Sequence, residues 1–481
     1  MQMRGLIVGA GEAGQMMARD LRRVPEFGFE PVGFLDDNAK RSVAGLPVLG
    51  ILADLPRVVA EQRVDMVIIA IPSLPSWEIN RLSQAASDIG VSVSYLPTFV
   101  AAMERDARVS DLRHLRVDLL LGREVRRVIR PASRAVIEGR RILVTGAGGS
   151  IGSELCRQLR RFHPSAIYLL DHDESNLHSL QLELDGHALL DDGQLLIADI
   201  RDRSRIRQIF QEVEPEVVFH AAAHKHLPLL ERHPCEGVKT NVLGTKHLVD
   251  AALEVETERF VLISTDKAAD PTSILGASKR LAEIVLQQAT DGPTKFGSVR
   301  FGNVLGSRGS FLSVLTEQLA SGEAVTVTHP EVTRFFMTIE EAVGLVIEAA
   351  SMAEDAGVFV LDMGEPVRIV DLVHSYAAQL HMEEPAFTIH YTGLRRGEKL
   401  SEALFGQAEE YRTTRHPNIW FTPPRPVGAD FPSQLERLFK GAEANRPDEV
   451  RDCLADLLPE YRASAMGAAD KALAAPYPDG F

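Results

Sequence analysis

Two glycine-rich segments constrain the fold of this chain more than any other feature of its sequence. They read Gly5-Leu-Ile-Val-Gly-Ala-Gly-Glu-Ala-Gly14 and Arg141-Ile-Leu-Val-Thr-Gly-Ala-Gly-Gly-Ser-Ile-Gly152. In each, a short apolar strand runs into glycines and then into a helical pattern, as at the start of a nucleotide-binding α/β unit. Because 481 residues also exceed what one core usually holds, the sequence predicts two such folds in tandem.

Short apolar runs alternate with helical stretches along both units. We expect strands of the first unit at residues 31–35, 65–71 and 91–96. In the second unit we expect them at residues 141–145, 166–170, 194–198, 217–221, 259–264 and 295–301. Strands that alternate with helices favour parallel sheets. The predicted fold class is therefore α/β, with two Rossmann-like, doubly wound domains.

Three regions follow from this alternation. Residues 1–135 are expected to form the N-terminal domain, which ends in an Arg-rich connector. Residues 136–428 are expected to form the second domain, and its regular alternation weakens after about residue 303. A small substrate-covering lobe is therefore expected mainly at 303–428, followed by an Ala-rich helical tail at 429–481.

The overall charge and the cysteines exclude several classes of protein. A formal net charge of −15 argues against non-specific binding of nucleic acid, which needs a basic face. Cys156, Cys235 and Cys453 are far apart, so neither a disulfide framework nor a zinc site is expected. No apolar run reaches the roughly 20 residues that cross a bilayer. We expect a cytoplasmic protein, or one at the cytoplasmic face of the inner membrane if a transmembrane N-terminus has been removed.

In the second glycine loop, Gly146, Gly149 and Gly152 follow at intervals of three. Such a turn lets backbone amides and the positive end of a helix approach a pyrophosphate. The next expected strand leads to Asp171, whose carboxylate would accept ribose hydroxyls and repel a 2′-phosphate, so NAD is favoured over NADP. A structural turn beside a solvated aspartate is the alternative. Further cofactor contacts are expected at Ser150, Ile151, Asp199, Ile200, Ala221, Ala222 and Lys279.

A second group of polar residues follows a later strand. The segment Ser264-Thr-Asp-Lys267 comes at the end of the strand expected at 259–264, and Lys279 lies twelve residues after Lys267. Doubly wound sheets carry their chemistry at the carboxyl ends of their strands. Thr265, Asp266 and Lys267 can therefore supply a hydrogen bond, an acid and a base at one edge. A surface loop is the alternative for such a triplet when its position in the fold is ignored.

With these residues the chain resembles a known family, the large nucleotide-sugar 4,6-dehydratases of bacterial polysaccharide and glycan biosynthesis. These are extended short-chain dehydrogenases/reductases, and the likeness is to the UDP-N-acetylglucosamine C6 dehydratases in particular. The resemblance extends from the first glycine loop to about Ile419. Together its segments are highly specific: Thr145-Gly-Ala-Gly-Gly-Ser-Ile-Gly-Ser-Glu154, His220-Ala-Ala-Ala-His-Lys-His226, Ser264-Thr-Asp-Lys-Ala268, Arg300-Phe-Gly-Asn-Val-Leu-Gly-Ser307, Thr333-Arg-Phe-Phe-Met337 and Gly393-Leu-Arg-Arg-Gly-Glu-Lys399.

The resemblance implies a redox-neutral removal of water from a UDP-N-acetylhexosamine. NAD takes hydride from C4 of the sugar, a base removes the C5 proton, the C6 hydroxyl leaves as water, and the hydride returns to C6. By similarity to the family, Lys267 is the C5 base and Asp266 is the acid that protonates the departing hydroxyl. Thr265 holds the region of the 4-hydroxyl, and Lys279 completes the catalytic set. The cofactor is expected to stay tightly bound, because it is regenerated in each turnover.

The resemblance also implies contacts for the UDP-sugar. Arg334 and Arg395 match positions that hold the diphosphate, for which arginine offers two-point recognition. Glu398 matches a position that accepts the uridine ribose hydroxyls. Lys225, His226 and Asn303 are expected on the substrate side. A homo-oligomer is expected from the family, and no metal is expected.

One departure from the wider enzyme class concerns Leu275. Short-chain dehydrogenases usually carry a tyrosine four residues before the active-site lysine, and here that position is Leu275. The large dehydratases commonly lack this tyrosine, whereas smaller C5-inverting relatives carry it, so Leu275 favours retention at C5. It leaves open which group takes the C4 hydroxyl proton, and Asp266 acting through Thr265 is our hypothesis. A UDP-sugar 4-epimerase and a catalytically inactive nucleotide-sensing protein are the remaining alternatives.

The first glycine loop is consistent with two different roles. Gly9, Gly11 and Gly14 match the dinucleotide fingerprint, and Asp36 and Asp37 follow at the end of the next expected strand. Both a bound nucleotide or regulator and a purely structural domain are consistent with this pattern.

Overall fold

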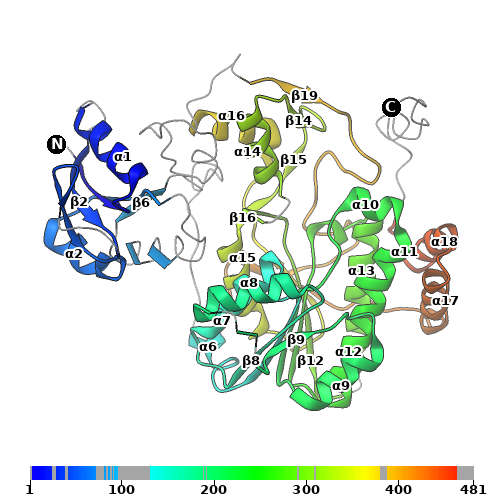
Figure 1. The fold of residues 1–481 in the computed structure, drawn as a ribbon. Coiled ribbons are helices and arrows are strands. Elements are labelled where there is room, and N and C mark those ends of the chain that lie inside the picture. Colours follow the sequence, from blue (N-terminus) through cyan, green and yellow to red (C-terminus); the bar gives the residue numbers. More distant parts are fainter. Residues whose placement is uncertain are drawn as a thin grey trace, which may run out of the picture. The chain divides into compact units, whose positions relative to one another are not determined.

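The computed structural model divides into two compact units, drawn as a ribbon in Figure 1. Unit 1 comprises Met1–Arg116 with Ala377–Met382, and unit 2 comprises Val117–Tyr376 with Glu383–Phe481. The residues that the structure describes are 3–23, 29–37, 42–71, 81–82, 85–86, 89, 91–95, 131–187, 189–190, 192–289, 292–307, 310–379 and 387–462.

The described part of unit 1 is an α/β layer around a six-stranded sheet with the strand order β3-β4-β2-β1-β5-β6. Strand β1 lies between β2 and β5 and runs parallel to both. Leu6 and Val8 of β1 pack into one apolar cluster and Ile7 into another, so the strand is buried on both faces. The elements are β1 (Met3–Val8), α1 (Glu12–Arg23), β2 (Phe29–Leu35), β3 (Ser42–Val43), β4 (Leu46–Gly50), α2 (Leu55–Gln62), β5 (Met66–Ile69) and β6 (Ser92–Tyr95).

Unit 2 is built on a sheet whose described strands number nine. Seven of them run parallel in the order β9-β8-β7-β10-β11-β12-β17. Successive strands are therefore added outward in one direction from β7 to β9 and in the other direction from β10 to β17, so the strand order reverses between β7 and β10. Two antiparallel strands, β21 and β20, extend the edge beyond β17. The strands are β7 (Arg141–Thr145), β8 (Ala166–Asp171), β9 (Leu195–Ile197), β10 (Val217–His220), β11 (Arg259–Ile263), β12 (Lys295–Arg300), β17 (Val358–Leu361), β20 (Arg412–Thr413) and β21 (Ile419–Thr422).

Helices cover both faces of this sheet because its strands alternate their apolar side chains between the two faces. Ile142 and Val144 of β7 pack with α7, α8 and α15, whereas Leu143 packs with α9, α12 and α13. These helices are α7 (Ser150–Arg160), α8 (Glu174–Asp185), α15 (Ile339–Ala350), α9 (Arg203–Val213), α12 (Thr245–Glu254) and α13 (Ile274–Gln287).

A third apolar cluster covers the outer side of α13, and this helix is therefore buried along its whole length. The cluster includes the C-terminal helices α17 and α18, which Figure 1 shows beside α11. The helices that contribute are α10 (Leu227–Arg232), α11 (Pro234–Val238), α17 (Phe431–Glu443) and α18 (Pro447–Leu457).

The remaining elements of unit 2 include three two-stranded pairings, β13 with β16, β14 with β19 and β15 with β18. These short strands match the irregular lobe expected after residue 303. They and the neighbouring helices are β13 (Asn303–Leu305), α14 (Phe311–Ser321), β14 (Val325–Val327), β15 (Thr333–Arg334), β16 (Phe336–Thr338), β18 (Val367–Arg368), α16 (Ile369–Gln379) and β19 (Ile389–Tyr391). Among the described helices, none is long and apolar enough to span a membrane.

The predicted fold class, two doubly wound α/β domains with a small lobe, is confirmed. The sheet of unit 2 is nevertheless larger than the six predicted strands, because β17, β21 and β20 come from the region assigned mainly to the lobe. The four residues of β17 are all buried, but so short an apolar run has no periodicity of its own that separates it from a helix segment. Most of the predicted connector, residues 105–130, and residues 463–481 of the tail lie outside the described residues.

Candidate active site

The parallel strands of unit 2 open at their carboxyl ends into one elongated cleft. Two adjoining cavities form it, and they share Gly146, Gly149, Ala221, Ala223 and His224. One cavity extends toward the end of β8, and the other, of about 720 Å³, extends toward the ends of β11 and β12. The cleft therefore lies where strand order reverses, which is where doubly wound sheets bind their ligands.

The glycine loop between β7 and α7 brings backbone close to the cleft. A Cβ at Gly152 would lie 2.0 Å from the carbonyl oxygen of Gly146, so a side chain would force the first turn of α7 away from the loop. Asp171, at the end of β8, accepts the amide of Gly148 at 2.9 Å and the amide of Asp173 at 3.1 Å. Its carboxylate is buried and held in place by the loop that precedes the helix.

Every residue predicted to contact the cofactor lines one or both cavities. At Asp199, the carboxylate accepts the guanidinium of Arg201 at 2.6 Å, so it is engaged by its own neighbour. The full set comprises Gly146, Gly149, Ser150, Ile151, Gly152, Asp171, Asp199, Ile200, Ala221, Ala222 and Lys279.

The predicted catalytic triplet forms a compact hydrogen-bonded group after β11. The Asp266 Oδ1 atom accepts the Thr265 hydroxyl at 3.0 Å and the Lys267 Nζ at 2.9 Å. Lys267 Nζ also donates to Asn303 Oδ1 at 3.1 Å. Asp266 is fully buried, and its Oδ2 atom has no hydrogen-bond partner in the structure. The Thr265 hydroxyl and the Lys267 amine thus meet at one carboxylate oxygen of Asp266. Thr265 and Lys267 line the larger cavity, whereas Asp266 is not among its lining residues.

Lys279 faces the same cavity from α13. Its Nζ donates to the carbonyl oxygen of Ile263 at 2.5 Å. Burial lowers the pKa of Lys279 to about 8, although the nearby Glu283 carboxylate opposes this change. Leu275, one turn earlier on α13, also lines the cavity, so an apolar side chain stands at the position of the missing tyrosine.

His220 is part of the sheet and not of a metal site. Its Nδ1 lies 2.8 Å from Thr145 Oγ1, and its Nε2 lies 2.9 Å from Thr245 Oγ1. Because the Thr245 hydroxyl donates to the carbonyl oxygen of Asn241, His220 must donate to it through Nε2 and accept from Thr145. Burial, together with Lys279, lowers the pKa of His220 to about 3, so the ring is neutral. Among the described residues, no group of His, Cys, Asp or Glu is arranged to hold a metal ion.

Asn241 is a site residue that the sequence analysis missed. Its side-chain amide donates to the carbonyl oxygen of His224 and to Ser278 Oγ, and its Oδ1 accepts the amide of His224. It thereby holds the loop after β10 against α13. Asn241 lies in a π-helical turn, Lys239–Gly244, a widened geometry that often occurs at functional sites. No local sequence pattern marks such a turn.

The predicted substrate contacts fall into two groups. Lys225, His226 and Asn303 line the larger cavity. The other three, Arg334, Arg395 and Glu398, are not among the residues that line the two cavities.

These three residues contact one another in the lobe. Arg334 pairs with Glu398 at 2.9 Å and donates to the carbonyl oxygen of Thr333 at 2.7 Å, while Glu398 also accepts the amide of Arg395 at 3.2 Å. Arg334 is buried and already paired, whereas Arg395 is exposed.

Comparisons with known proteins agree with this geometry. Residues 142–424 match the family described as polysaccharide biosynthesis protein, and residues 1–97 match one described as CoA-binding domain. The chain is 42% identical over 437 residues to a probable polysaccharide biosynthesis protein, EpsC of Bacillus subtilis (strain 168), which covers 89% of this chain and 72% of that protein.

A more distant relative is a UDP-N-acetylglucosamine 4,6-dehydratase (inverting) of Campylobacter jejuni, 29% identical over 289 residues, covering 59% of this chain and 82% of the enzyme. Among solved structures, Pen from Bacillus thuringiensis is similar with a TM-score of 0.55 and 30% identity, covering 60% of this chain and 90% of that one. The chain therefore belongs to the polysaccharide biosynthesis protein family and is a short-chain dehydrogenase/reductase that modifies nucleotide sugars.

Proposed function

We propose that this chain is an NAD-dependent UDP-N-acetylglucosamine 4,6-dehydratase that retains the configuration at C5. The observation that carries the proposal is the hydrogen-bonded group of Thr265, Asp266 and Lys267, of which Thr265 and Lys267 line the cleft. An elimination needs one group that takes a proton and another that gives one. Asp266 and Lys267 meet this need 2.9 Å apart, at the edge of a nucleotide-binding fold.

The residues of the glycine loop suit a dinucleotide. The amides at the N-terminal end of α7 would hold the pyrophosphate, Asp171 would accept hydroxyls of the adenosine ribose, and Lys279 would donate to the other ribose. A Cβ at Gly146 would lie 2.6 Å from the amide nitrogen of Ala222, so the loop lies tight against the strand end beside it. When bound, NAD supplies reversible oxidation of the sugar. The buried carboxylate of Asp171 favours a cofactor without a 2′-phosphate.

Proton transfer balances within the Asp266–Lys267 pair. The proton that the C4 hydroxyl loses on oxidation passes through Thr265 to Asp266. Lys267 then takes the C5 proton, and Asp266 gives its proton to the C6 hydroxyl, which leaves as water. As C6 receives the hydride, Lys267 returns its proton to C5, so Asp266 and Lys267, 2.9 Å apart, both end the turnover in the protonation state in which they began it. Asn303 Oδ1 accepts from Lys267 and orients the amine.

Leu275 supports retention at C5. Its side chain lines the cavity and has no proton to give, so no donor stands at the position where inverting relatives are expected to carry a tyrosine. With Lys267 returning the proton it took, the proton is added to the face from which it was removed. The Campylobacter jejuni relative is named as an inverting enzyme, so stereochemistry requires its own measurement.

The proposal is tested by incubating the purified chain with UDP-N-acetylglucosamine, without added reductant, and following the sugar nucleotide by mass spectrometry. We expect loss of one water. Lys267→Ala and Asp266→Asn should slow this reaction by about 10²- to 10⁴-fold, because each removes a proton-transfer group. Lys440→Ala, at an exposed position of α17, is the control and should react like the wild type.

Proton NMR of the product then distinguishes the two C5 configurations. A product with unchanged mass and inverted C4 would replace the proposal by a 4-epimerase. Binding of UDP-N-acetylglucosamine and UDP-N-acetylgalactosamine without conversion of either would favour the inactive nucleotide-sensing protein.

A further inference from the structure

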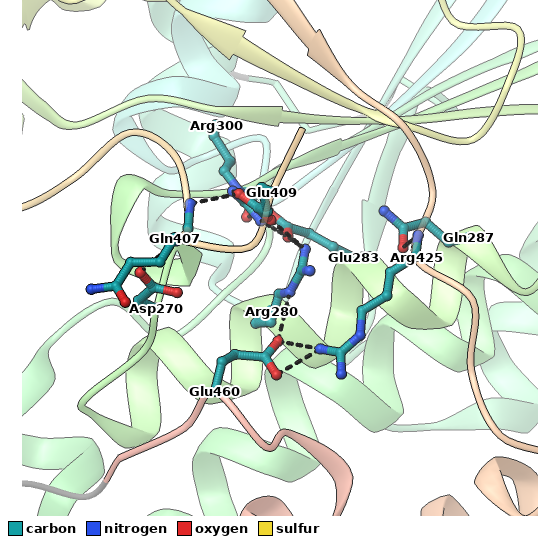
Figure 2. A network of polar contacts seen from close by, with 11 residues as sticks. Asp270, Arg280, Glu283, Gln287, Arg300, Gln407, Glu409, Arg425 and Glu460 are labelled. Carbon is teal, nitrogen blue, oxygen red and sulfur yellow. Dashed lines mark hydrogen bonds and ion pairs between the residues drawn. The ribbon is translucent and has the colours of Figure 1, made fainter. Parts of the chain in front are cut away.

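A largely buried network of charged side chains joins β12, α13 and the C-terminal segment that ends at Glu460 (Figure 2). At its centre, Arg300 of β12 and Glu283 of α13 are both fully buried. Arg300 donates to Glu283 through Nε at 2.8 Å and through Nη2 at 2.7 Å. It also pairs with Glu409 at 2.7 and 2.9 Å. Arg300 holds the pKa of Glu409 at about 2, against the effect of burial, so this carboxylate stays charged.

The network continues to the C-terminal segment of the chain. Arg280 of α13 lies 3.2 Å from Glu283, 3.0 Å from Glu409 and 3.3 Å from Glu460. Glu460, which follows α18, also accepts Arg425 at 2.5 and 2.6 Å. Figure 2 shows these side chains arranged in a chain from Arg300 to Arg425. Three arginines and three glutamates balance one another in charge.

One hydrogen bond connects this network to the catalytic triplet. Ser264, the residue before Thr265, donates its hydroxyl to Glu283 Oε1 at 2.6 Å. Glu283 also lies one helical turn after Lys279. A single carboxylate therefore contacts the strand end that carries Thr265 to Lys267 and belongs to the helix that carries Lys279.

The backbone pairing of this strand end stops within the catalytic triplet. The amide of Ser264 donates to Val299 at 2.7 Å and that of Asp266 to Phe301 at 3.0 Å, after which the parallel pairing ends. The Ser264–Glu283 bond is thus a side-chain anchor at the point where the ladder stops. Buried ion pairs can often be replaced by apolar side chains without loss of stability. The directional hydrogen bonds of this network therefore indicate a need for fixed geometry more than for stability.

We propose that Glu283 is a positioning residue of the active site. Through Ser264 it sets where Thr265, Asp266 and Lys267 lie, and through Arg280 and Glu460 it makes the C-terminal segment part of that support. The inference rests on the proposed function for its substrate, because the reacting group is the Asp266–Lys267 pair.

The first test is Ser264→Ala, which removes the link and leaves Glu283 Oε1 paired with Arg300. We expect kcat to fall by about tenfold or more, because a misplacement of about 1 Å can cost about 100-fold in rate. Ser264 itself lines the larger cavity, but its hydroxyl donates to Glu283, so KM should stay within about twofold of wild type. Ser264→Thr keeps the hydroxyl and should restore most of kcat.

Ser298→Ala is the matched control. Ser298 is fully buried on the neighbouring strand β12, two residues before Arg300 and so on the same face, and its hydroxyl has no hydrogen-bond partner in the structure. Both variants lose one buried hydroxyl, but only Ser264→Ala cuts the link to Glu283. Equal kcat values for the two variants would overturn the proposal.

The contribution of the C-terminal segment is tested with Glu460→Gln, which leaves Arg280 paired with Glu283 and Glu409. We expect a smaller loss, about two- to fivefold in kcat, because Ser264 keeps its own bond to Glu283. Glu436→Gln removes an exposed charge of α17 and is the control. If Glu460→Gln behaves like this control, the C-terminal segment is not part of the support.

Failure of this inference is distinguishable from failure of the proposed function. Water loss by the wild type tests the reaction, whereas the ratio between Ser264→Ala and Ser298→Ala tests the positioning in any UDP-sugar conversion that the wild type performs. If the wild type converts no sugar, the rate of acetylation of Lys267 by acetic anhydride, read by peptide mass spectrometry, replaces turnover. A change of about twofold or more in Ser264→Ala alone supports the proposal, and unchanged labelling overturns it.

Discussion

The two glycine loops of the chain have nearly the same local geometry. A Cβ at Gly14 would lie 1.9 Å from the carbonyl oxygen of Gly9, as one at Gly152 would lie 2.0 Å from that of Gly146. In unit 1, Asp36 Oδ2 accepts the amide of Ala10 at 2.7 Å, just as Asp171, at the end of β8, accepts the amide of Gly148 in unit 2. The fingerprint thus produces the same strand–turn–helix closure in both units.

The two units differ in what stands beyond the loop. The strand that neighbours β7 on the catalytic side, β10, is followed by a loop whose polar residues Lys225 and His226 line the cleft. In unit 1 the corresponding strand β5 is followed by Ala70 and Ile71, as β10 is followed by Ala221 and Ala222, and the next nine residues, 72–80, lie outside the described residues. Asp37 of unit 1 is engaged with the amide of Leu52 at 2.9 Å. The segment after β6, which takes the place of β11, lies outside the described residues. A glycine fingerprint therefore specifies a turn, and the chemistry depends on the residues at the other strand ends.

The largest expected effect comes from adding one methyl group to each loop. Gly152→Ala should abolish retention of NAD and slow turnover by about 100-fold or more, because the new Cβ meets a backbone oxygen at 2.0 Å and moves the start of α7. Gly14→Ala should leave both within about twofold of wild type, although it destabilises unit 1. NAD released on denaturation is measured by chromatography, and circular dichroism verifies folding. Loss of NAD in Gly14→Ala would mean that the glycine loop of unit 1 also supports the cofactor site.

A medium effect is expected from the paired aspartates. Asp171→Asn should weaken NAD binding by about 10- to 100-fold, because a charge-assisted hydrogen bond contributes roughly 1.5 to 3 kcal/mol. It should also reduce the preference for NAD over NADP. Asp36→Asn makes the same substitution at the matching aspartate of unit 1 and preserves the shape of the side chain. It should not alter NAD affinity, as measured by isothermal titration calorimetry. Equal losses in the two variants would mean that unit 1 also contributes to the cofactor site.

The smallest effect concerns the charge of Lys279, which belongs to unit 2 and so tests that unit alone. Its pKa is about 8 in the folded chain and about 10.5 when unfolded, so the unfolded state binds more protons between these values. The free energy of unfolding of unit 2 should therefore rise from pH 8 to pH 10.5, by at most about 3 kcal/mol from this group. Urea unfolding at several pH values should show a flatter profile for Lys279→Met. The same slope in both proteins would contradict a buried, destabilised ammonium.

Local patterns in the sequence were sufficient for the elements around the site. The strand expected at 141–145 is found as β7, Arg141–Thr145, and the strands ending at 221 and 264 are found one residue shorter. Short apolar runs bounded by glycine or polar residues specify buried strands locally. For the same reason Thr265, Asp266 and Lys267 could be assigned to a strand end before their contacts were known.

The sequence by itself therefore determined that there are two Rossmann-like folds and which triplet stands at the edge of the second sheet. Only the tertiary structure decided that β17 and the antiparallel strands extend that sheet, that a π-helical turn directs Asn241 to the loop after β10, and that Arg334 pairs with Glu398. It also decided that Glu283 meets Ser264, Arg300 and, through Arg280, Glu460. These contacts join residues far apart in the chain, so which charged side chains are buried together depends on how the strands and helices pack.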